Sequence, residues 1–247
     1  MPPPPVLAMP ALEACEGPHG LASPLPDACL ETIDTDRPHQ TDTPHVVPAG
    51  HVQVESALAS LEVGYGPTRL GLFQDEYRFG LVSHMDAELL LDHAVFEPDA
   101  RRFESPGPVG ARVKVNIVEG GGWAPAITLV PWVLVPVAPS QALRGGPYVF
   151  LGWELPARLE LEMNVGVLLR AQPAEGAAPV LASALTWTIV GDLRVFVDVY
   201  ATGPDVQLGT GALWAFTRDV QIDAGTYVGL HGDEPAATPF VGLSVRR

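Results

Sequence analysis

Ionisable side chains are the residues of this chain best placed to do chemistry, and they recur at every second position. Between residues 158 and 170, Arg158, Glu160 and Glu162 alternate with apolar side chains. Neighbouring groups of opposite charge on one face can pair with each other or create an electrostatic field for a solute. Because side chains two residues apart share one face of a β-strand, this spacing also predicts the element that carries them.

Catalytic motifs are missing from the sequence. The candidate bases and nucleophiles are His84, His93, His231, Ser83, Ser183 and Ser244. No G-x-S-x-G turn and no H-E-x-x-H pattern brings any of them together. The glycines at 120–122 lack the Lys and the Ser or Thr of a phosphate-binding loop. We therefore expect no enzymatic activity, no cofactor and no metal site.

The two cysteines, Cys15 and Cys29, both precede the alternating region. At this spacing they could close a disulfide in an oxidising compartment such as the periplasm. The alternative is two free thiols in an irregular segment, and the sequence does not choose between these interpretations.

The composition narrows the class of protein. Hydrophobic residues make up 47% of the 247 residues, yet prolines and a threonine interrupt the longest apolar run, 127–137. A membrane-spanning helix needs about 18 or more consecutive apolar residues, so a helical membrane protein is excluded. The net charge of −15 argues against nucleic acid and against docking on an anionic membrane surface, because both would repel the chain.

Alternation of apolar and polar residues organises the chain from Gly50 onward. The run 158–170 is too long for an ordinary strand of a soluble protein and suits a tilted strand that crosses a bilayer. We expect its apolar face and the equivalent faces of other strands to contact lipid, at Leu161, Met163, Val165, Val195, Val197 and Ile222. Turn residues divide the region into about twelve strands. The strands are predicted near 51–63, 68–81, 86–97, 110–119, 123–137, 147–156, 158–170, 178–190, 192–202, 206–217, 220–230 and 239–247.

Two of these strands do not follow the regular alternation of apolar and polar residues. In 68–81 the apolar parity changes between Leu72 and Tyr77, which would require a β-bulge. In 123–137 both faces are apolar, and Pro131 would lose a hydrogen bond of the sheet.

The predicted connections alternate in length. The short ones lie at 82–85, 120–122, 156–157, 191–192 and 218–219, and the longer ones at 98–109, 138–146, 171–177 and 231–238. Outer-membrane barrels have short turns at the periplasmic rim and longer loops outside. An even number of strands then places both termini at the short-turn rim.

Tryptophans and charged residues complete the predicted barrel. Trp123, Trp153, Trp187 and Trp214 map to the short-turn rim and predict an aromatic girdle at headgroup level, although tryptophans also favour strand ends in soluble barrels. Trp132, in mid-strand, does not fit this girdle. The residues predicted to line the lumen are Asp86, Glu88, Asp92, Arg112, Lys114, Arg158, Glu160, Glu162, Asn164, Arg170, Arg194, Asp198 and Asp223.

The segment before the first strand carries a family resemblance. Thr35, Asp36, Arg37 and Pro38 form a TDRP motif, and VPAGHVQVE follows at 47–55. Together with PFVGLSVR at 239–246, this pattern resembles the MetA-pathway-of-phenol-degradation family, often labelled simply "transporter". The resemblance covers about 33–247 and implies an outer-membrane barrel. The chain ends in Arg246-Arg247, where such barrels usually finish on an aromatic residue.

The sequence therefore predicts an all-β fold: a closed antiparallel transmembrane β-barrel over 50–247 after a proline-rich, irregular extension over 1–49. We expect residues 1 to about 45 to be dispensable for barrel closure. The expected location is the bacterial outer membrane, although no complete signal peptide is visible at the start of the sequence.

Passive passage of small solutes is the predicted function, and the resemblance adds aromatic or hydrophobic compounds as solutes. The acidic excess would favour cationic or neutral ones. A closed structural barrel with a salt-bridged lumen and a soluble β-barrel binding module are the alternatives. The expected partners are the lipid bilayer and a small molecule; the solute and the oligomeric state stay open.

Overall fold

The computed structural model describes residues 15–64, 66–103, 107–138, 142–171 and 176–247, and only the backbone of Asp92 and His93. Within these ranges the strands are β1 Val52–Glu62, β2 Arg69–Val82, β3 Met85–Glu97, β4 Arg102–Phe103, β5 Val109–Val118, β6 Ala126–Val135, β7 Arg144–Leu155, β8 Leu159–Arg170, β9 Ala177–Val190, β10 Leu193–Thr202, β11 Asp205–Thr217, β12 Val220–His231 and β13 Thr238–Arg246. Two short 3₁₀ turns accompany them, η1 Asp27–Cys29 and η2 Pro156–Arg158.

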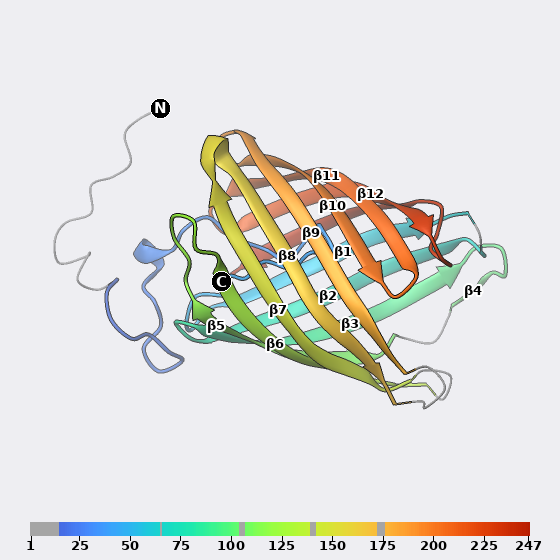
Figure 1. Cartoon of the computed structure of the whole chain (residues 1–247), viewed down its shortest axis with the longest axis horizontal. Coiled ribbons are helices and arrows are strands. Elements are labelled where there is room, and N and C mark those ends of the chain that lie inside the picture. Colours follow the sequence, from blue (N-terminus) through green and yellow to red (C-terminus); the bar gives the residue numbers. More distant parts are fainter. Residues whose placement is uncertain (1–14, 65, 104–106, 139–141, 172–175) are drawn as a thin grey trace.

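The sheet closes on itself into a barrel (Figure 1). Each long strand pairs antiparallel with its neighbours, and β1 closes the ring by pairing with both β13 and β2. The two-residue β4 pairs only with the end of β3 and takes no part in closure. Twelve strands thus form a closed antiparallel barrel, as the sequence predicts. In the described ranges no helix has the length and apolarity to span a membrane.

Alternation along each strand separates an apolar outer surface from a polar lumen. On β8, Glu162 and Asn164 are buried inside, whereas the outward side chain of Val165 is 41% exposed. Large apolar side chains are exposed in this way around the barrel wall. This surface suits lipid tails, so the alternative of a soluble module with its apolar face inward is wrong.

The two irregular strands have different explanations. β2 keeps its register with β1 and β3 through residues 69–79, so the bulge predicted there is wrong. Phe73, within this stretch, has a positive φ of 53°. On β6 the lumen face is itself apolar, because Val130 is buried there while Leu129 faces outward. Pro131 lies directly opposite Pro147 of β7.

Both ends of the barrel sequence lie at the rim of short turns. Val52, at the start of β1, exchanges backbone hydrogen bonds of 2.8 Å with Arg247. Figure 1 shows the C-terminus and the blue segment that contains η1 at this end of the barrel, with β4 at the other. Parts of the longer connections, 104–106, 139–141 and 172–175, lie outside the described residues.

Candidate functional site: the lumen and the segment inside it

Residues 33–47, which we call the plug, lie inside the barrel. The plug enters at the short-turn rim, where Ile33 N donates to Arg218 O at 2.7 Å in the turn between β11 and β12. It ends near the same rim, where Val47 N donates to Asp86 Oδ2 at 2.8 Å. Thr41 and Thr43, between these points, are fully buried. The plug is therefore a loop inserted from one rim.

The local sequence explains why the plug is bound by side chains and not by strand pairing. Pro38 and Pro44 have no backbone N–H to donate to a sheet. The remaining donors find lumen side chains: Arg37 N donates to Glu55 at 2.9 Å, Gln40 N to Asp198 at 2.8 Å and Asp42 N to Asn164 at 2.6 Å. These bonds satisfy buried backbone groups and fix the plug against several strands.

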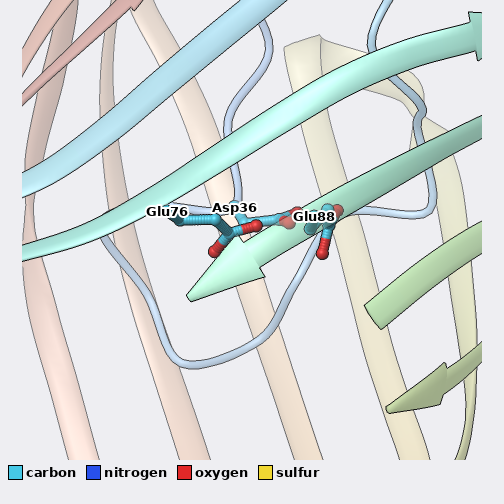
Figure 2. Close-up of side chains that lie close together, drawn as sticks. All are labelled: Asp36, Glu76 and Glu88. Carbon is cyan, nitrogen blue, oxygen red and sulfur yellow. The ribbon is translucent and has the colours of Figure 1, made fainter. Parts of the chain in front are cut away.

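A cluster of charges ties the plug to the β2–β3–β5 wall. Carboxylate oxygens of Asp36, Glu76 and Glu88 lie within 4.8 Å of one another (Figure 2). Lys114 Nζ donates to Asp36 at 2.5 and 2.6 Å. Arg112 Nη2 donates to Asp36 at 2.8 Å and to Glu76 at 2.6 Å, and its Nε contacts Glu88. Three carboxylates at this spacing could ligate a metal, but these cations already neutralise them, so the cluster fits ion pairing between plug and wall.

Arg78 extends the same network toward the short-turn rim. Its guanidinium donates to Glu55 Oε1 and Asp86 Oδ2, each at 3.0 Å, and to the carbonyl of His45 at 2.9 Å. Arg78, Glu55 and Asp86 are almost fully buried. A buried guanidinium requires such partners, since an unpaired charge inside the barrel would be very costly.

The opposite wall holds the tip of the plug through aromatic and polar contacts. Arg37 Nη2 lies 3.1 Å from Asp223 Oδ1, and the Tyr227 hydroxyl donates to the carbonyl of Pro38. His39 Nε2 lies 3.3 Å from Glu162 Oε2. The plug is thus held from both sides of the lumen, by β12 and β8 on one side and by the β2–β3–β5 wall on the other.

A cavity of about 1100 Å³ lies at the short-turn rim, below the plug. Asp34, Glu160 and Glu162 are among its lining residues. Arg194 Nη1 lies 3.6 Å from Glu160 and 3.9 Å from Asp34. We call this cavity the vestibule; its lining has more carboxylates than cations.

Residues 15–32 cover part of this rim. A disulfide joins Cys15 and Cys29, which decides between the two interpretations of the cysteines. His19 N donates to Ser83 Oγ at 3.1 Å, and Arg218 Nη1 donates to Asp27 O at 2.6 Å. In the described part of the segment before the barrel, η1 is the only helical turn, and residues 33–47 lie inside the lumen.

Most predicted lumen residues face inward. Buried there are Asp86, Glu88, Lys114, Glu162, Asn164, Asp198 and Asp223, and half-buried are Arg112, Glu160, Arg170 and Arg194. Arg158 is a correction: it is exposed in η2 at the rim, where its φ of 61° belongs to a turn and not to a strand. The side chain of Asp92 lies outside the described part of the chain. That these residues contact a moving solute stays a prediction.

The plug residues Asp36, Arg37 and Asp42 were not predicted to lie in the lumen. Their charges, set among prolines and ahead of strands with inward Arg and Lys residues, were the available signal.

The tryptophan side chains do not all face the same way. Trp187 and Trp214 face outward near the short-turn rim, each 49% exposed, whereas Trp132 faces the lumen. Contact of Trp123, Trp153, Trp187 and Trp214 with lipid headgroups stays a prediction.

Comparison with known proteins places the fold and the family. The KdgM porin superimposes with a TM-score of 0.52 at 11% identity, over 79% of this chain and 98% of that one. An outer membrane channel from Pseudomonas putida F1 gives a TM-score of 0.52 at 9% identity, over 80% of this chain and 95% of that one. At such identities the likeness concerns the fold. No curated protein matches the sequence.

The family assignment rests on the sequence itself. The family described as "Putative MetA-pathway of phenol degradation" matches residues 35–246, from the TDRP motif in the plug to the last strand. This span includes the plug from residue 35 onward and the complete barrel wall. The chain therefore belongs to this family of phenol-degradation MetA-pathway proteins and is an outer-membrane β-barrel.

Proposed function

We propose that this barrel is a passive channel for small solutes and that the plug limits its permeability. The observation that carries the proposal is how the plug is held. It makes no strand pairing with the wall among the described residues and depends on side-chain contacts such as Lys114 to Asp36. Such contacts can be exchanged for solvent without breaking any strand pair of the barrel.

Two further features support passage. A twelve-stranded barrel without its plug has a lumen between that of a filled eight-stranded barrel and that of an open porin. The vestibule already provides about 1100 Å³ of space on the inner side of the plug. Aromatic or hydrophobic compounds belong to the proposal through the family.

The alternative is a closed structural barrel whose lumen is filled by ion pairs. The dense network around Arg78 and Arg112 favours it, because paired buried charges resist separation. The two functions predict different conductance of the barrel once the plug is removed.

Conductance in a planar bilayer separates them. We compare the natural chain with a variant in which residues 33–47 are replaced by a Gly-Ser linker of equal length, and with the rim substitution Arg158→Gln as control. A channel predicts small conductance for the natural chain and for the control, and larger conductance for the linker variant. A linker variant that keeps heat-modifiable migration, and is therefore folded, but carries no current would establish the closed barrel.

A further inference from the structure

We propose that the outer end of the lumen carries a binding site for small aromatic anions, formed by Trp132, Tyr148 and Arg144. The proposal rests on the channel function above and names the solute class that the long-loop end would bind first. It also gives a role to the apolar lumen face of β6.

Two aromatic rings provide the flat part of the site. Trp132 on β6 and Tyr148 on β7 stack, with ring centroids 5.4 Å apart and an interplanar angle of 8°. Gly166 on β8 lets the Tyr148 ring lie against the wall, since a Cβ at that glycine would lie 2.0 Å from Tyr148 Cδ1. The two rings are half-buried, so part of their surface remains accessible. Aromatic faces of this kind bind planar rings by stacking.

Arg144 supplies the charge at the outer end of the same wall. Its position on β7 lies opposite Leu134 of β6 and Arg170 of β8, on the strand face that also carries Tyr148. In the described part of the chain no carboxylate lies within ion-pair distance of Arg144, and its Nε is buried without a hydrogen-bond partner.

The site lies between the long-loop rim and the plug. Arg144 is the first residue of β7 at that rim, and Tyr148 follows it inward. Phe150, the next residue on this face, pairs with Asn164, which accepts a hydrogen bond from Asp42 of the plug. A ring stacked on Trp132 and Tyr148 with a carboxylate toward Arg144 would therefore bind before it reached the plug. An aromatic carboxylate combines the two required groups, because a guanidinium binds carboxylates through charge-assisted hydrogen bonds.

Benzoate and its uncharged analogue benzamide test the proposal. Binding to the full chain in detergent is measured by titration calorimetry, with heat-modifiable migration as the check that each variant is folded. We expect benzoate to bind about tenfold more tightly than benzamide, the effect of one charge-assisted contact. Arg144→Gln should remove this preference and leave benzamide binding unchanged, Arg144→Lys should retain part of it, and Trp132→Leu should weaken both ligands. Arg158→Gln is the matched control at the opposite rim and should change neither.

Three results would overturn the proposal: no binding of benzoate, equal binding of benzoate and benzamide, or an unchanged preference in Arg144→Gln. Equal binding would indicate a site for neutral aromatic compounds. Because the site lies outside the plug, binding does not require an open lumen. A closed barrel would still bind benzoate, and a conducting channel could fail to bind it, so this experiment and the conductance experiment fail independently.

Discussion

Lys114 Nζ donates hydrogen bonds to both carboxylate oxygens of Asp36, so one ammonium group of the barrel wall holds the centre of the plug. The two residues are 78 positions apart in the sequence, and both are buried. Wall and plug therefore stabilise each other at this contact.

Removing the ammonium group should leave Asp36 with fewer cationic partners. We expect Lys114→Met to lower the free energy of unfolding by about 1.5–3 kcal/mol, the usual contribution of a hydrogen bond to a charged group, because Arg112 still pairs with Asp36. Urea unfolding in lipid vesicles measures it. The double variant Lys114→Met/Asp36→Asn should be more stable than the single one; equal stability would show that the two residues are not coupled.

A cationic side chain on the outward face of β8 should destabilise the barrel. Met163 lies on this face, next to the exposed Val165. Met163→Arg should destabilise the barrel by about 2–4 kcal/mol, since the charge would lie near the middle of the bilayer. Met163→Leu is the control. A free energy of unfolding in bilayers that does not change with arginine would contradict a lipid-facing position.

The plug should influence ion selectivity. It carries Asp34, Asp36 and Asp42 but only one cationic residue, Arg37. The residual current of the plugged barrel should prefer cations, because negative charge beside a narrow passage favours them. Replacing residues 33–47 by the Gly-Ser linker should move the reversal potential under a salt gradient toward zero. A larger cation preference in the linker variant would refute this assignment.

Acid should weaken the contact between the β11–β12 turn and the last strand. Burial alone would raise the pKa of Asp219, but hydrogen bonds from Arg246 at 2.7 Å and from Arg218 at 3.1 Å lower this pKa below its usual value. A carboxyl whose pKa is lowered on folding stabilises the folded barrel above its unfolded pKa. This contribution disappears as the pH falls through the lower, folded pKa, that is, below about pH 4.

Unfolding of the natural chain and of Asp219→Asn, followed as a function of pH, checks this expectation. The natural chain should be the more stable at neutral pH, and the difference should shrink in acid. A difference that grows as the pH falls would show that the pKa is raised instead.

The barrel wall could be predicted because its signal is local. Residues two apart share a face, so the alternation in 158–170 was enough to define β8 and its polar side. Arg158 was assigned wrongly because the positive φ values of Ala157 and Arg158 keep both residues in the turn, so the strand begins one residue later than the pattern indicates. The burial of Asp36 could not be predicted in the same way, since it depends on partners such as Lys114 that are distant in sequence.

The inserted loop also bears on how the molecule is assembled. Both ends of residues 33–47 leave through one opening, near Arg218 on one side and Gly80 on the other. No chain terminus has to pass through the closed barrel. The strands β1 and β13 can therefore pair while the lumen still contains water. Closure of the wall does not then require that the loop is already inserted.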